Sequence, residues 1–230
     1  MFRLSKHCFL LYNTLQKGSV KMENRYASRI EKVQMSSIRV VMEKVEKLRS
    51  QGKSVVSLCA GEPDFNTPEG IKKATIEALN DNQTHYSSNR GYLGLRKKVA
   101  HLLKEQTTID YDSDTEIIMT CGCSEAINNV CQAFINKDDE VIIFTPAFVS
   151  YQNTVLLCQG IPVEIPLKLS LGFQIDIEEV KNKITKKTKM IILNNPNNPT
   201  GAVYQKETLE QLCKLARENN ILILADEIRL

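Results

Sequence analysis

Four stretches of this sequence place reactive or hydrogen-bonding groups directly after short apolar runs. The first is TCGCSEA at 120–126, where Gly122, Cys123 and Ser124 stand at an expected strand-to-helix turn. The free N–H groups of a helix N-terminus bind anions, most naturally a phosphate. A plain tight turn with Ser124 as the N-cap remains the alternative interpretation.

Two further stretches carry an aromatic ring and a set of amides. The segment TPAFVSYQ at 145–152 offers Phe148, which could stack on a flat ring or pack against the edge of a sheet. The segment NNPNNPTGAVY at 194–204 combines asparagines with prolines and Gly201, which restrict the backbone around Asn198. A loop with this many backbone-restricting residues is more typical of a functional site than of a plain turn. The Asn198 amide could bond a phenolate-like oxygen.

The fourth stretch is ADEIRL at 225–230, which follows a strongly apolar run. Its Asp226 could pair with a protonated ring nitrogen, or it could serve as an N-cap or an ion-pair partner. A phosphate site, a stacking ring, an amide and a carboxylate together match the polar groups of pyridoxal phosphate, a cofactor that acts as an electron sink.

The elements that must position these groups follow an alternating pattern. A helix is expected over 28–50, a short strand over 55–58 and another helix over 93–106. Further strands are expected at 117–119, 141–144, 161–165, 189–193 and 221–225, and helices near 124–136, 149–159, 176–184 and 206–219. This alternation predicts an α/β fold, a mainly parallel sheet with helices on both faces. Ligands bind beyond the carboxyl ends of such strands, so the four groups should share one edge of the sheet.

Composition excludes several other classes of protein. The 230 residues are 42% hydrophobic and 25% charged, with a net charge of +3 that is too small to imply nucleic acid or a membrane surface as a partner. No apolar run approaches the roughly 18–20 residues that span a bilayer. The seven cysteines have no paired spacing and the three histidines are far apart, so neither a disulfide framework nor a metal site is expected.

The sequence closely resembles the class I/II aminotransferases, the aspartate-aminotransferase-like branch of the fold-type-I pyridoxal-phosphate enzymes. The resemblance runs from about residue 22 to residue 228. Its segments are GEPDFNTPEG at 61–70, HYSSNRGYLGLRKKVA at 85–100, GCSEA at 122–126, NNPNNPTGAVY at 194–204 and ILILADEI at 221–228. It implies a transfer of an amino group between an amino acid and a 2-oxo acid. Related β-elimination or ring-forming chemistry stays open, because one fold hosts several reactions.

The resemblance also implies roles for single residues. The Gly61 backbone N–H would lie near the substrate carboxylate, and Asn198 would bond the phenolic oxygen of the cofactor and help to bind the substrate. Tyr86 would reach the cofactor phosphate of a neighbouring subunit, which predicts a homodimer. The phosphate contacts would come from Gly122, Cys123 and Ser124, the ring stacking from Phe148 and the ring-nitrogen pair from Asp226.

Two departures from the family pattern stand near the last residue. Many members carry tyrosine where this chain has Arg229. The family's S-x-S-K lysine, which holds the cofactor as a Schiff base and moves the proton, is expected beyond Leu230, so no catalytic residue is assigned in this chain. The chain is therefore expected to be C-terminally truncated. The alternative to an aminotransferase is an inactive fragment or splice product, acting at most as a partner of a full subunit.

The resemblance divides the chain into three parts. Residues 22–65 would form an N-terminal arm and part of a small domain, and residues 66–230 an incomplete pyridoxal-phosphate-binding large domain. Residues 1–21 are basic and free of acidic residues. They are expected to be a disordered extension or a mitochondrial-type presequence, which leaves cytoplasm and mitochondrion open as locations.

Overall fold

A computed structural model describes residues 27–33, 37–59, 61 and 63–228 of the chain. The expected extension at 1–21 and the departure at Arg229 lie outside the described residues. The N-terminal helical elements are η1 (Ser28–Lys32), α2 (Ser37–Ser50), α3 (Glu69–Asn80) and α4 (Leu93–Thr107). The remaining elements are α5 (Cys123–Phe134), β1 (Glu140–Thr145), α6 (Ser150–Leu157), β2 (Ile161–Pro166), η2 (Leu169–Leu171), α7 (Ile177–Lys183), β3 (Thr188–Asn194), α8 (Lys206–Glu218) and β4 (Leu222–Asp226).

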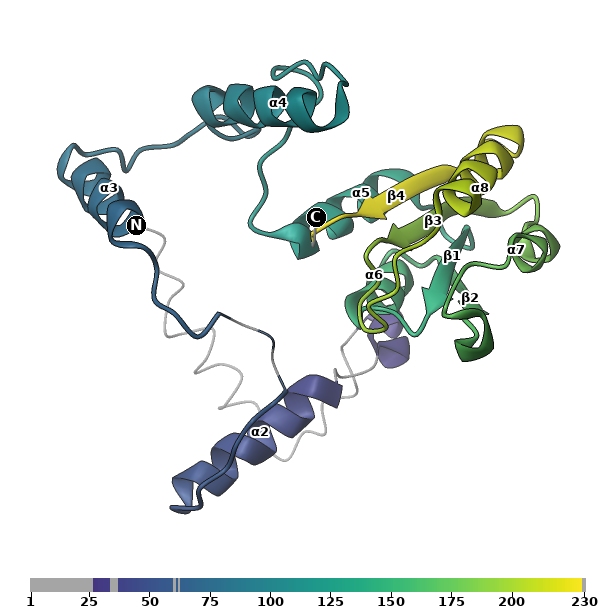
Figure 1. Ribbon diagram of the computed structural model, residues 1–230, viewed down its shortest axis with the longest axis horizontal. Coiled ribbons are helices and arrows are strands. Elements are labelled where there is room, and N and C mark those ends of the chain that lie inside the picture. Colours follow the sequence, from purple (N-terminus) through teal and green to yellow (C-terminus); the bar gives the residue numbers. More distant parts are fainter. Residues whose placement is uncertain (1–26, 34–36, 60, 62, 229–230) are drawn as a thin grey trace, which may run out of the picture.

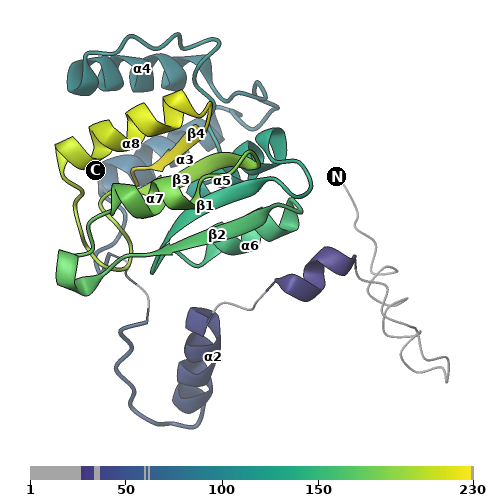
Figure 2. The same ribbon diagram turned by 90° about the vertical axis from the view of Figure 1, so that its right-hand side faces the viewer.

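The four strands form one parallel sheet in the order β2-β1-β3-β4 (Figures 1 and 2). The central strands β1 and β3 are almost wholly buried, as expected for continuous apolar runs covered on both faces. The predicted strands at 141–144, 161–165, 189–193 and 221–225 are confirmed to within one residue at each end. The predicted fold class, a mainly parallel sheet with helices on both faces, is also confirmed.

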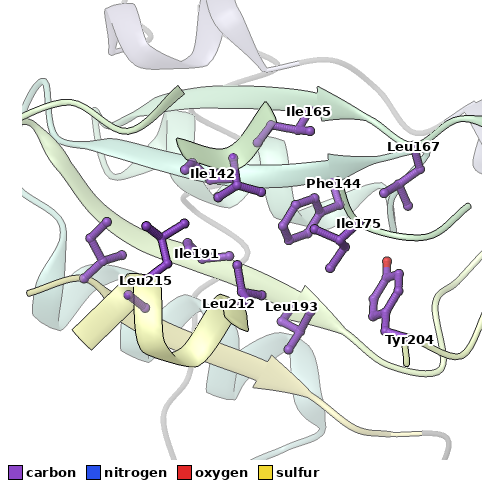
Figure 3. Packing of buried hydrophobic residues seen from close by; sticks show 13 residues of the cluster. Ile142, Phe144, Ile165, Leu167, Ile175, Ile191, Leu193, Tyr204, Leu212 and Leu215 are labelled. Carbon is purple, nitrogen blue, oxygen red and sulfur yellow. The ribbon is translucent and has the colours of Figure 1, made fainter. Parts of the chain in front are cut away.

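One face of the sheet packs against α7 and α8. Ile142, Ile191 and Leu212 are fully buried at the centre of this cluster (Figure 3). Ile142 is the register partner of Ile191, and Ile191 is the partner of Ile223, so the same face continues across β1, β3 and β4. Tyr204 closes the cluster at the carboxyl ends of the strands, and burial raises its pKa to about 12.

The opposite face packs against α5 and α6. Val141, Met190 and Ile192 point to this side, where Cys131 of α5 and Val155 of α6 cover them. Residues on a strand alternate between the two faces, so the odd-numbered side chains of β1 and the even-numbered side chains of β3 and β4 meet α5 and α6. The same alternation determines which side chains at the strand ends lie on the α5 and α6 side of the sheet.

Three expectations about secondary structure are wrong. Residues 117–119 and 55–58 form no strand, because these short runs find no neighbouring ladder; Ile118 is 61% exposed and Leu58 is 93% exposed. The helix expected over 28–50 is not continuous. Val33 is extended after the 3-10 turn η1, and α2 begins only at Ser37.

Of the elements before residue 108, η1 contacts α6, whereas α2, α3 and α4 stand apart from the sheet. Helices α2, α3 and α4 make no extensive contact with the other described elements, and Figure 1 shows α3 and α4 well separated from the strands. Their apolar side chains are consequently exposed, including Val41, Ile71 and Leu95. Among the described residues, none of the helices has the length and apolar character needed to cross a membrane.

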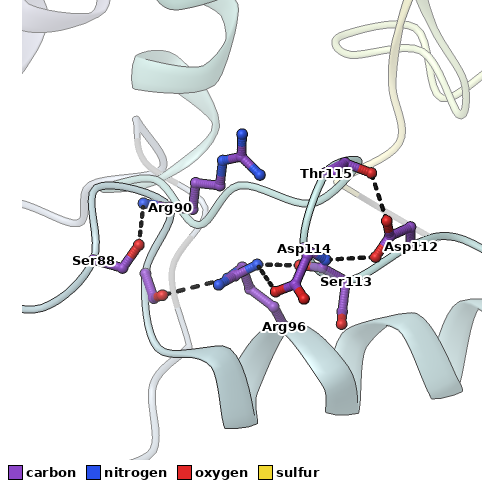
Figure 4. A network of polar contacts seen from close by, with 8 residues as sticks. Ser88, Arg90, Arg96, Asp112, Ser113, Asp114 and Thr115 are labelled. Atoms are coloured by element: carbon purple, nitrogen blue, oxygen red, sulfur yellow. Dashed lines mark hydrogen bonds and ion pairs between the residues drawn. The ribbon is translucent and has the colours of Figure 1, made fainter.

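A polar network fastens α4 to the segment that leads into the sheet domain (Figure 4). The Arg96 side chain is 6% exposed. Its guanidinium donates to the carbonyl oxygens of Gly91 and Ser113 and contacts the Asp114 carboxylate. Nearby, Asp112 accepts hydrogen bonds from the Asp114 backbone and from the Thr115 hydroxyl, and these bonds lower the pKa of Asp112.

Candidate functional site

A cavity of about 240 Å³ lies at the carboxyl ends of β1, β3 and β4, beside the N-terminus of α5. This is the position where open α/β sheets bind ligands. Its lining combines two loops, two helix starts and the end of β4. The lining residues are Cys121, Gly122, Cys123, Ser124, Ile127, Phe148, Tyr151, Asn194, Asn198, Asp226 and Ile228.

The Asp226 carboxylate is the buried charge of this cavity, with the residue 7% exposed. The Tyr151 hydroxyl donates to its Oδ2 atom over 2.5 Å, and the Ile228 backbone N–H donates to its Oδ1 atom over 3.2 Å. Burial, followed by the hydrogen bond to Asp226, raises the pKa of Tyr151. Tyr151 therefore stays a neutral donor, and the carboxylate is held in a fixed orientation at the end of β4.

Cys123 is the second side chain coupled to this carboxylate. Burial raises the pKa of its thiol, and the charge of Asp226 and a hydrogen bond to it add to the effect. The thiol is therefore a protonated donor toward Asp226 rather than a nucleophilic thiolate.

The rate of alkylation should distinguish Cys123 from Cys121, which precedes the same turn, lines the cavity and is exposed. With iodoacetamide at about pH 8, Cys123 should react several times more slowly than Cys121, because burial raises the pKa of the Cys123 thiol and limits access to it. Peptide mass spectrometry over time measures both rates in one sample. Asp226→Asn should speed the labelling of Cys123 and leave Cys121 unchanged; equal rates for the two cysteines in the unsubstituted chain would contradict this assignment.

The loop after β3 is organised by its own asparagine side chains. Asn194, 5% exposed, accepts the Asn198 backbone N–H at Oδ1 over 2.7 Å and donates from Nδ2 to the Asp226 carbonyl over 3.0 Å. Asn197 accepts from the Thr200 hydroxyl over 2.8 Å, and Asn195 accepts the Tyr204 backbone N–H over 3.0 Å. The loop is thus held rigidly, and the Asn198 side chain lines the cavity.

The remaining walls come from α5 and from the loop after β1. Gly122 is the N-cap of α5 and has φ of 80°, a left-handed conformation that suits glycine. Among the described residues, no side chain caps this helix, so its first N–H groups are open to a ligand from the cavity. Phe148 stands edge-on to Tyr151, with ring centroids 5.8 Å apart. The cavity thus offers a carboxylate, an amide, an aromatic ring and the positive end of a helix dipole.

Six of the predicted site residues line this one cavity: Gly122, Cys123, Ser124, Phe148, Asn198 and Asp226. Gly61 and Tyr86 do not line it, and both are exposed. Sequence reasoning missed Tyr151 and Asn194. The period-two alternation along β3 could have indicated Asn194, because Met190, Ile192 and Asn194 share a face. Among the described residues, no lysine lines the cavity.

Comparison with known proteins supports the same interpretation of the fold. Residues 53–228 match the family model described as aminotransferase class I and II. A probable aspartate/prephenate aminotransferase of Aquifex aeolicus is 37% identical over 206 residues, which are 90% of this chain and 52% of that protein. The aromatic-amino-acid aminotransferase 2 of Thermococcus litoralis is 40% identical over 202 residues, 88% of this chain and 51% of that protein.

Solved structures agree with these sequence matches. The aspartate aminotransferase of Thermus thermophilus with maleate superposes with a TM-score of 0.85 and 39% identity, covering 90% of this chain and 54% of that one. The chain spans about half the length of the curated relatives it matches. Because the family model covers most of the sequence and the relatives share the same fold, the chain belongs to the aminotransferase class I and II family.

Proposed function

We propose that this chain provides the pyridoxal 5'-phosphate-binding part of an enzyme that transfers an amino group between an amino acid and a 2-oxo acid. The observation that carries the proposal is the convergence of Asp226, Asn198, Phe148 and the N-terminus of α5 on one cavity. Each of these groups suits a different part of the cofactor. When bound, the cofactor supplies an electron sink for the carbon that bears the amino group.

The chain's own residues would bind and orient the ring. The Asp226 carboxylate, fixed by Tyr151, would keep a proton on the ring nitrogen. The Asn198 amide would donate to the phenolic oxygen, and Phe148 would cover one face of the ring and exclude water from it. The N–H groups at the start of α5 and the Ser124 hydroxyl would hold the phosphate.

The substrate and the partner subunit belong to the same proposal. The substrate carboxylate would be bound by the Gly61 backbone N–H and by Asn198. Tyr86, whose side chain is fully exposed in this chain, would reach the phosphate bound by a second copy. A homodimer with two such cavities is therefore part of the proposed function.

A binding experiment on the 230-residue chain tests the proposal. The probe is pyridoxamine 5'-phosphate, which has the ring, the phenolic oxygen and the phosphate but no aldehyde to react with surface lysines. Calorimetric titration should show one saturable site per chain, with at least about tenfold weaker binding of pyridoxamine, which lacks the phosphate hydrogen bonds. Absence of saturable binding, or equal affinity for the two compounds, would count against the proposed function.

A further inference from the structure

The side chain of Asn194 bonds to the backbone of both Asn198 and Asp226, and the Asn195 backbone N–H donates to the same Asp226 carbonyl oxygen over 3.2 Å. The Asn194 Oδ1 atom accepts the Asn198 N–H over 2.7 Å, and its Nδ2 atom donates to the Asp226 carbonyl over 3.0 Å. Both bonds are internal, because the residue is only 5% exposed. One amide therefore contacts the backbone of the two residues that present an amide and a carboxylate to the cavity.

The position of Asn194 follows from strand alternation and register. Asn194 is the last residue of β3 and the register partner of Asp226 at the end of β4. The preceding pair on the same face, Ile192 and Leu224, packs toward α5 and α6. Asn195 lies one residue further along, and its side chain bonds the Tyr204 N–H instead. The side chain of Asn194 thus lines the cavity, whereas that of Asn195 bonds to Tyr204, which packs on the opposite face of the sheet.

We propose that Asn194 is a positioning residue that fixes Asn198 and Asp226 relative to each other, so that both contact the same ligand ring. The inference rests on the proposed function for the identity of that ring. It is independent of the phosphate end of the cavity, since the Asn194 side chain bonds to Asn198 and Asp226 at the ring end. A residue with a purely structural role would instead affect every ligand group equally.

Hydrogen exchange on the ligand-free chain tests the first half of this inference. Asn194→Ala should accelerate exchange of the Asn198 N–H by roughly tenfold, because its acceptor is lost. Asn194→Asp keeps an oxygen at the same place and should preserve slow exchange at Asn198. Asn195→Ala is the matched control from the same loop and should leave it unchanged. An Asn198 N–H that exchanges as slowly in Asn194→Ala as in the unsubstituted chain would overturn the proposal.

Ligand binding tests the second half. Asn194→Ala should lower the affinity for pyridoxamine and for pyridoxamine 5'-phosphate by the same factor, about tenfold. Its affinity for inorganic phosphate should be unchanged, and Asn195→Ala should bind all three probes as the unsubstituted chain does. Equal losses for the phosphate probe and the ring probes would show a merely structural role and refute positioning.

The two proposals fail in different ways. If the unsubstituted chain binds neither ring compound, the proposed function is wrong, and the exchange rates of Asn198 still decide whether Asn194 positions that residue. If the chain binds both compounds and Asn194→Ala binds them equally well, the positioning role is wrong and the proposed function stands. If Asn194→Ala does not fold, Asn194→Asp decides: rapid exchange at Asn198 in that variant would contradict the proposal.

Discussion

Replacing Asp226 with alanine is expected to weaken the binding of pyridoxamine 5'-phosphate by ten- to a hundredfold. A hydrogen bond between a charged donor and a carboxylate contributes roughly 1.5–3 kcal/mol, and the Asp226 carboxylate is buried where water replaces it poorly. The same change removes the acceptor of the Tyr151 hydroxyl. The free energy of unfolding should therefore also fall, by about 1–3 kcal/mol.

Two further variants separate the charge from the packing. Asp226→Asn removes the negative charge, so it should lose nearly as much affinity as the alanine variant. It keeps the shape of the side chain and an acceptor for Tyr151, so it should lose much less stability. Tyr151→Phe keeps the carboxylate and should change the affinity only slightly. Isothermal titration measures the affinities and urea unfolding the stabilities. If Asp226→Asn bound the ligand within about twofold of the unsubstituted chain, the carboxylate would have no role in ring binding.

The largest loss of stability is expected for Ile191→Ala. Ile191 is fully buried in β3, between its register partners Ile142 and Ile223. Removing its branched side chain loses the transfer free energy and leaves a cavity beneath α8, which typically costs about 2–5 kcal/mol. That loss is large against the roughly 5–15 kcal/mol that stabilises an ordinary domain. Urea denaturation should show a lower midpoint with little change in slope.

Leu222→Ala provides the matched control on the neighbouring strand. Leu222 stands at the start of β4 and is 39% exposed, so its truncation removes less buried surface. Its cost should be clearly smaller than that of Ile191→Ala. Similar losses for the two variants would mean that the sheet is not packed as Figure 3 shows it.

The sheet itself could be predicted because β1, β3 and β4 each contain a continuous apolar run between turns, although β2 is interrupted by the exposed Glu164. Val141 to Phe144 in β1 shows the pattern: these side chains are apolar in succession because both faces are covered. The three-residue run at 117–119 has the same composition but gains no ladder. Composition alone does not reveal whether a neighbouring strand exists, and that information lies in distant parts of the chain.

The sequence predicted some residues of the candidate site and missed others. Asp226 and Asn198 could be found because each follows an apolar strand, and strand exits converge in parallel sheets. Tyr151 was hidden because it lies on α6, 75 positions from the carboxylate it contacts. Tyr86 and Gly61 were assigned by resemblance alone, and their roles stay predictions because neither reaches the cavity within this chain.

The arrangement of the cavity also has a consequence for the order of assembly. All of its described lining groups come from residues 121–228, and the last of them enter with β4, which pairs only with β3 among the described strands. During synthesis from the N-terminus, helix α5 is complete long before Asp226 emerges. The ring site is therefore finished only when β4 docks. A ligand bound there would stabilise the docked strand by mass action, so the availability of ligand could regulate how much nascent chain reaches its final fold.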